Sequence, residues 1–254
     1  MTIDLEIRRF NPETDTEPRF QTYTVTVEPT DRVLDALMEV KRNQDGSLAF
    51  RKSCAHGVCG SDAMVINGQE RLACKTLVQE VADGDGAVVT LEPLKHLPLR
   101  RDLIVEQDPF FERWRSVQPY LIDEGAAPER ERLQSPAERA AFDDPTQCIL
   151  CAACYSACPI LDGQNPRFVG PAAIVQAARF ILDSRDKGLE DRLVVLDHPD
   201  GVWACENHFE CTRACPRGIK VTKNINLTKR QVGRRRPSSV NRTPTGSPDP
   251  SERA

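Results

Sequence analysis

The stretch CILCAACYSACP, from Cys148 to Pro159, decides the fold of the second half of this 254-residue chain. Its cysteines follow the spacing C-x2-C-x2-C-x3-C-P. A later stretch, CENHFECTRACP from Cys205 to Pro216, repeats this spacing with His208 in place of the second cysteine. Because one cysteine spacing occurs twice in the same chain, we expect both stretches to perform the same chemistry.

Cysteines at this spacing are typical ligands of iron–sulfur clusters. In two-cluster bacterial ferredoxins the fourth cysteine of each run binds the other cluster, so the two runs fold against each other. This crossing rule predicts a first cluster with the ligands Cys148, Cys151, Cys154 and Cys215. It predicts a second cluster with the ligands Cys158, Cys205 and Cys211. The residue at position 208 then decides whether that cluster has three or four irons.

A third group of ligand-type residues lies near the N-terminus. It follows the plant-type pattern C-x4-C-x2-C…C, with an aspartate in the third position, and consists of Cys54, Cys59, Asp62 and Cys74. Glycines in the loop permit backbone N–H groups to approach a cluster closely. Because three cysteines leave one ligand missing, we expect Asp62 to bind iron rather than to act as an ordinary turn carboxylate. The three groups together use all ten cysteines.

Disulfide bonds are the alternative use of these cysteines. The first residues, Met1 to Asp4, have neither the basic nor the apolar region of a secretory signal, so we expect a reducing compartment. Close C-x2-C spacings also suit metal ligation better than cross-links between distant elements. We therefore expect thiolate ligands and not a disulfide framework.

Length, hydropathy and charge restrict the remaining classes. The length favours two domains. No apolar stretch reaches the roughly 18–20 residues of a membrane span, and the best candidate, Ala172 to Leu182, contains Gln176 and Arg179. Any membrane role is therefore expected through a partner. The net charge of −4 gives no support for a nucleic-acid partner.

The expected fold class is α+β. We predict a β-grasp domain of the plant-type ferredoxin kind over residues 1–104, then a linker with packing helices over 105–134. A helical two-cluster domain follows over 135–233, and a disordered tail over 234–254. Period-two alternation predicts strands at Ile3–Ile7 and Tyr23–Val27, and Asn67-Gly68 predicts a hairpin turn.

Helical spacing supports the other predicted elements. Thr30 or Asp31 is expected to cap a helix through Val40, and Pro109 to break the helices of the linker. A further strand is expected at Ala87–Leu91. In the second half we expect helices and no strand, with helices at Pro136–Phe142, Ala172–Asp183, Leu189–Leu196 and Thr222–Gln231.

Nearly the whole chain resembles the iron–sulfur subunit of succinate dehydrogenase and quinol:fumarate reductase. The motifs that carry the resemblance are Ser53–Asp62, Asn67-Gly68, Leu72–Cys74, Cys148–Pro159, Asn165-Pro166, Phe168–Ala172, Asp183–Asp186 and Cys205–Pro216. The resemblance implies [2Fe–2S], [4Fe–4S] and [3Fe–4S] clusters. An aspartate such as Asp62 among the [2Fe–2S] ligands is a variant found in this family.

The resemblance also implies partners and a place of action. A flavoprotein subunit with covalent FAD would oxidise succinate, and this chain would pass electrons singly to quinone at a transmembrane anchor. The chain would lie at the cytoplasmic face of the bacterial inner membrane, attached through its partners. The residues expected near the quinone or the anchor are Pro159, Gln164, Glu206 and His208. Arg213 is also expected to face the anchor.

The chain departs from its relatives at the quinone end. Relatives carry a tryptophan shortly after the crossing Cys-Pro, where this chain has Ile160–Gln164 without an aromatic residue. They carry histidine where Glu206 stands, and an apolar residue where His208 stands. His208 could complete a four-iron cluster, but the resemblance favours a three-iron cluster with His208 turned outward.

Three other functions remain open at this point. Fumarate reductase is the same machinery in reverse. A stand-alone iron–sulfur carrier would lack partners. The aromatic segment Phe110–Tyr120 and the unusual quinone-end residues argue against it, because we expect them to leave exposed apolar surface. Glycolate and heterodisulfide enzymes have related subunits, but these lack the N-terminal loop in this form.

Overall fold

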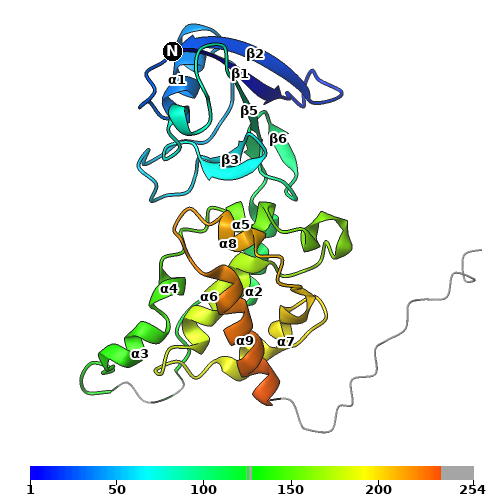
Figure 1. Cartoon of the computed structure of the whole chain (residues 1–254). Helices are drawn as coiled ribbons and strands as arrows, with labels where there is room; N and C mark the ends of the chain where they lie inside the picture. The colour runs from blue at the N-terminus through cyan, green and yellow to red at the C-terminus, as the bar shows by residue number, and fades with distance from the viewer. Residues whose placement is uncertain (124, 126–127, 236–254) are drawn as a thin grey trace, which may run out of the picture.

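The computed structural model describes residues 1–123, 125 and 128–235. The chain forms two units, one above the other in Figure 1, with the N-terminal sheet in the upper unit and most of the helices in the lower one. Most of the predicted tail, residues 236–254, lies outside the described residues. The order of the fold, a mixed sheet followed by helices, is the predicted α+β arrangement.

A five-stranded mixed sheet forms the N-terminal unit, with the order β2-β1-β5-β3-β4. Its strands are β1 (Thr2–Arg9), β2 (Arg19–Thr26), β3 (Ala63–Ile66), β4 (Gln69–Leu72) and β5 (Val88–Glu92). β1 pairs in parallel with β5, and the other pairs are antiparallel. A parallel central pair with a helix packed on the sheet is the β-grasp arrangement that the sequence predicts.

Local sequence explains these elements. Ile3, Leu5 and Ile7 of β1 are almost fully buried and alternate with half-exposed residues. Asn67 and Gly68 both have positive φ, 49° and 76°, as a type I′ hairpin turn requires. Helix α1 (Val33–Asn43) is capped by Arg32 and not by the predicted Thr30 or Asp31, and the Asp35 carboxylate accepts a hydrogen bond from the Arg32 N–H.

The segment after the sheet differs from the prediction. It forms a small hairpin of β6 (Leu99–Arg101) and β7 (Ile104–Val105), which the sequence analysis missed, and then helix α2 (Asp108–Ser116). Pro109 lies in the first turn of α2, where its missing N–H costs nothing, so it starts a helix and does not break one. Phe110 is 2% exposed and packs edge-on against Tyr155. The expectation of an exposed aromatic segment is therefore wrong for Phe110.

The second half is helical, and no strand forms among its described residues. Its helices are α3 (Pro136–Ala141), α4 (Asp143–Thr146), α5 (Ala153–Ser156), α6 (Pro171–Ile181), α7 (Leu189–Leu196), α8 (Glu210–Arg213) and α9 (Val221–Arg235). Short turns of other helical type are η2 (Ile160–Gln164) and η3 (Val202–Ala204) in this half, and η1 (Val78–Glu80) in the sheet unit. α6 is buried along almost its whole length and packs against α9. α9 continues past the predicted end at Gln231.

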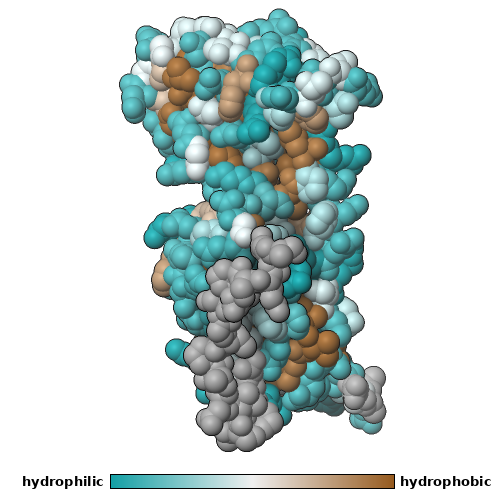
Figure 2. Space-filling model, turned by 90° about the vertical axis from the view of Figure 1, so that its right-hand side faces the viewer, coloured by the Kyte–Doolittle hydropathy of each residue, from teal (hydrophilic) through white to brown (hydrophobic). Residues whose placement is uncertain are grey.

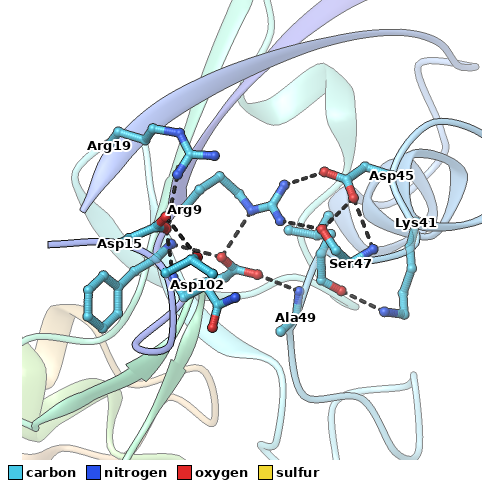
Figure 3. A network of polar contacts seen from close by, with 12 residues as sticks. Arg9, Asp15, Arg19, Lys41, Asp45, Ser47, Ala49 and Asp102 are labelled. Carbon is cyan, nitrogen blue, oxygen red and sulfur yellow. Dashed lines mark hydrogen bonds and ion pairs between the residues drawn. The ribbon is translucent and has the colours of Figure 1, made fainter. Parts of the chain in front are cut away.

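A buried ionic network ties three parts of the sheet unit together (Figure 3). The Arg9 guanidinium contacts Asp102 at 3.0 Å, Asp45 at 2.6 Å and the Ser47 hydroxyl at 2.9 Å. Asp102 also accepts hydrogen bonds from the N–H groups of Phe10 and Ala49. The network thus fixes the end of β1, the β6–β7 turn and the chain segment that leads to Cys54.

The surface is mostly hydrophilic on the face shown in Figure 2, with separate apolar areas in the upper and lower units. Exposed apolar side chains include Val58, Phe209 and Val194. In the described part of the chain, no helix combines the length and the apolar character needed to cross a bilayer.

Candidate iron–sulfur sites

The loop that carries Cys54 and Cys59 directs backbone N–H groups toward sulfur. The N–H groups of Val58 and Cys59 lie 3.4 and 3.3 Å from the Cys54 sulfur. These amides, together with that of His56, lower the pKa of Cys54 to about 6, because they stabilise its thiolate. A thiolate surrounded by amide donors is the environment that iron–sulfur ligation requires.

Asp62 has the buried position that ligation demands. Its side chain is 3% exposed, and its Oδ2 accepts a hydrogen bond of 2.6 Å from the Cys74 N–H. Its Oδ1 is buried without a hydrogen-bond partner among the described residues. A buried carboxylate oxygen without a donor is costly. The group therefore fits an iron ligand better than it fits an ordinary turn carboxylate, and Cys74 lies beside it.

Four cysteines from distant parts of the chain line one cavity in the helical unit. They are Cys148, Cys151 and Cys154 of the first run and Cys215 of the second. Apolar side chains such as Val175 and Ile219 form the other walls. Burial raises the pKa of Cys151 to about 12 and that of Cys154 well above its usual value, so these thiols are poor anions unless a cation binds them.

A second cavity holds the remaining three cysteines. It is lined by Cys158, Cys205 and Cys211, together with Pro159, Glu206 and His208. The carbonyl of Cys205 accepts a hydrogen bond from Lys229 of α9, and the sulfur of Cys211 lies 3.6 Å from the Thr222 hydroxyl. The two runs thus contribute to both cavities, which is the arrangement that the crossing rule anticipates.

The backbone repeats in the two runs. Leu150 and Ala152 have φ angles of 55° and 63°, and their counterparts Asn207 and Phe209 have 63° and 67°. Such angles are uncommon for residues other than glycine. Each run then enters a four-residue helix, α5 or α8, both at the end of the helical unit that faces β3 (Figure 1). The matching conformation indicates that the runs are built to hold similar groups.

The predicted quinone-end residues do not all gather at the second cavity. Glu206 and His208 line it and are exposed, and the His208 Nε2 lies 3.2 Å from the Glu206 carboxylate. Gln164 is exposed at the end of η2 and is not among the lining residues. Arg213 lines the cleft between the two units and pairs with Glu210, so the expectation that it faces an anchor finds no support.

Two residues of this region escaped the sequence analysis. Phe209 lines the second cavity, is 52% exposed and has positive φ. Its place in the motif, where the first run has Ala152, is the signal that could have identified it. Ser156, 2% exposed, bonds to the sheet unit from within the first run. A lone serine between two ligands carries no such signal in the sequence.

The helical unit offers thiol groups around two cavities, and the sheet unit offers thiol groups and the Asp62 carboxylate near its ligand loop. None of the ten cysteines forms a disulfide. Among the described residues, no three His, Cys, Asp or Glu side chains converge closely enough for a single metal ion.

Family models match both units. A "2Fe-2S iron-sulfur cluster binding domain" matches residues 4–112, and a "4Fe-4S dicluster domain" matches residues 144–219. Both descriptions agree with the two types of cysteine spacing.

Whole-chain relatives are also similar. The fumarate reductase iron–sulfur subunit of Mycobacterium tuberculosis is 43% identical, over 85% of this chain and 87% of its own. The succinate dehydrogenase iron–sulfur subunit of Coxiella burnetii is 39% identical, over 91% of this chain and 97% of its own. A chain of the Mycobacterium smegmatis Sdh1 complex in the apo form superposes with a TM-score of 0.83 and 27% identity, covering 94% of this chain and 99% of that chain.

Proposed function

Because this chain belongs to the family of iron–sulfur subunits of succinate dehydrogenase and fumarate reductase, we propose that it carries single electrons between a flavoprotein subunit and quinone. The observation that supports this most is the series of three ligand sets along the stacked units. The first set lies in the loop below the sheet, and the other two surround adjacent cavities in the helical unit. When bound, iron–sulfur clusters supply one-electron carriers at these sites.

The first set would hold a [2Fe–2S] cluster through Cys54, Cys59, Asp62 and Cys74. The unpartnered Oδ1 of Asp62 supports this assignment, because iron would satisfy it. Replacing Asp62 with cysteine should retain the cluster and change its midpoint potential, since thiolate is a softer donor than carboxylate. An unchanged potential in Asp62→Cys, measured by EPR-monitored titration, would show that the carboxylate is not a ligand.

The second set would hold a [4Fe–4S] cluster, with Cys215 crossing from the later run. The third set, Cys158, Cys205 and Cys211, would hold a [3Fe–4S] cluster. The half-exposed position of His208 and its contact with Glu206 support a histidine that turns outward. His208→Ala should therefore keep the EPR signal of an oxidised three-iron centre. A four-iron cluster in the wild type that is lost from His208→Ala would contradict this assignment.

Two exposed surfaces suit the expected partners. Lys52, His56 and the 55% exposed Val58 form the outer side of the [2Fe–2S] loop, which we assign to the flavoprotein with covalent FAD. Glu206, His208 and Phe209 form the rim of the last cavity, which we assign to the transmembrane anchor and quinone. Pro159 also lines this cavity, whereas Gln164 lies at the end of η2, outside the lining. We assign the chain to the cytoplasmic face of the inner membrane, where its partners would hold it.

We favour succinate oxidation as the physiological direction, with fumarate reduction as the second candidate because a fumarate reductase subunit is 43% identical. The deciding experiment is purification of the assembled complex, followed by metal analysis and assays with succinate and with fumarate. We expect a flavoprotein and an anchor to co-purify, and succinate:quinone activity to exceed fumarate reduction. A chain that purifies alone with its clusters would instead be a stand-alone carrier.

A further inference from the structure

The two units touch where a ligand loop of one meets a ligand loop of the other. Gly60 follows Cys59 directly, is buried and has a φ of 70°. A Cβ built on Gly60 would lie 2.6 Å from the Cys151 Cβ and 3.0 Å from the Cys151 Cα. Such distances are far below van der Waals contact, so glycine alone permits this approach. The backbone beside one ligand therefore lies directly against another ligand.

A buried latch holds this contact in place. The Ser156 hydroxyl, on α5, donates a hydrogen bond of 2.9 Å to Glu70 of β4, and it accepts one of 2.9 Å from the Lys95 N–H. The Glu70 side chain is only 8% exposed. Ser156 lies between Cys154 and Cys158, so the latch joins the sheet unit to the same turn that carries the helical ligands. Hydrogen bonds to a buried charged group are among the stronger ones in proteins.

On the side of the β3–β4 hairpin the two units are apart. A cleft of about 600 Å³ separates the β3–β4 hairpin and Lys75 from Arg213 and Cys215. An electron-transfer route from the first ligand set to Cys215 would have to cross this cleft or pass around it. The route through Gly60 needs only the peptide bond that follows Cys59 and a single van der Waals step to Cys151.

We propose that Gly60 is a positioning residue for electron transfer between the first two centres, and that Gly60 and Cys151 form the crossing point between the units. This inference rests on the proposed function. With a [2Fe–2S] centre held by Cys54, Cys59, Asp62 and Cys74 and a [4Fe–4S] centre held by the set that includes Cys151, one electron would pass from the reduced first centre to the oxidised second one, with no bond or proton exchanged. Gly60 keeps the crossing short by having no side chain, and the Ser156–Glu70 latch keeps it closed.

The test compares alanine variants of three glycines in the assembled complex. Gly60→Ala introduces a Cβ against the Cys151 backbone, which cannot move aside easily. Gly57→Ala has the same type of φ, 79°, in the same loop, but its Cβ meets only the flexible Lys75 side chain. Gly68→Ala has a φ of 76° with nothing within 4 Å. The controls therefore carry the backbone strain of an alanine at positive φ without blocking the crossing.

Iron and sulfide content and the EPR spectrum of each centre are measured first in the wild-type complex, because centres missing there would refute the proposed function itself, and then in each variant. The readouts for the inference are the spin–spin interaction between the two centres after dithionite reduction, and the rate of electron transfer between them in a single turnover. We expect Gly60→Ala to weaken the interaction and to slow the transfer several-fold, with neither change in the two controls. Equal interaction in Gly60→Ala and wild type would overturn the proposal.

A second variant covers the case in which Gly60→Ala does not retain both centres. Ser156→Ala removes the latch and leaves every ligand and glycine in place. It should weaken the same spin–spin interaction, and an unchanged interaction would refute the role of the latch. Independently of any variant, wild-type complex in which both reduced centres are present but magnetically isolated would refute the crossing point.

Discussion

Replacing Arg192 of α7 should destabilise the helical unit far more than replacing any exposed arginine. Arg192 is fully buried, and its guanidinium contacts the Asp186 carboxylate, itself 1% exposed, at 2.7 Å. It also donates hydrogen bonds to the carbonyls of Gln118 and Tyr120. The side chain thereby fastens the segment after α2 to the loop before α7.

The magnitude follows from what Arg192→Met leaves behind. The Asp186 carboxylate would remain buried, with the N–H groups of Ile122 and Gly188 as its donors but without its cation. Removal of one partner from a buried pair costs about 3–5 kcal/mol. Asp186→Asn should cost less, on the order of 1–3 kcal/mol, because the amide oxygen keeps one of these two donors and Arg192 keeps its hydrogen bonds to the Gln118 and Tyr120 carbonyls. The two substitutions share one interaction, so the double variant should cost less than their sum.

The assay is guanidinium unfolding of the cluster-loaded chain under anaerobic conditions, monitored by circular dichroism. The control is Arg235→Met, because Arg235 pairs with Glu190 at 3.2 Å while both side chains are more than half exposed. Exposed pairs contribute about 0–1 kcal/mol. If Arg192→Met shifts the free energy of unfolding no more than Arg235→Met does, the buried pair does not hold the linker and the reasoning is wrong.

Two further outcomes are expected. Hydrogen bonds from Ser47, Tyr23 and Arg9 hold the pKa of Asp45 well below its usual value, so its contribution to stability is present above about pH 4 and is lost as the pH falls further. Asp45→Asn should therefore lower stability at neutral pH and flatten the acid side of the stability curve; equal acid sensitivity in both proteins would contradict this. Chelation of the iron should lower the unfolding midpoint of the helical unit, because helices of four residues are not stable alone and metal ligation contributes to folding. An unchanged midpoint after complete iron removal would show that packing alone suffices.

The sequence predicted the sheet unit well where a local rule determines the structure. Asn67-Gly68 specifies a type I′ turn through its own backbone preferences, and alternation along β1 specifies which side chains face the core. The repeated spacing, through its crossing rule, also anticipated that Cys215 lines one cavity with the cysteines of the first run, while their binding of one cluster stays a prediction. In each case the information lies within a few residues or within a repeated motif.

The wrong prediction for Pro109 has a different physical origin. Proline breaks a helix only in its interior and favours the first turn, and Pro109 lies in the first turn of α2. That Arg213 faces an anchor stays a prediction; its side chain lines the cleft between the units and pairs with Glu210. The direction of a side chain on a four-residue helix depends on tertiary packing, which sequence distance does not report.

The contact between Gly60 and Cys151 shows why the sequence can predict each ligand set without predicting how close two ligand sets lie to each other. Each ligand set follows a spacing that the sequence displays, since its members must surround one group. The distance between sets depends instead on how two units dock, and here docking relies on a missing side chain and on a buried Ser156–Glu70 hydrogen bond. A glycine in a ligand loop is already explained by the backbone conformation of the loop. The sequence therefore does not reveal that Gly60 also permits close packing between the two units. Electron transfer depends both on the ligand sets and on the distance between them. Gly60→Ala changes the contact between the units and leaves every ligand intact, so it tests that distance more directly than loss of a cysteine does.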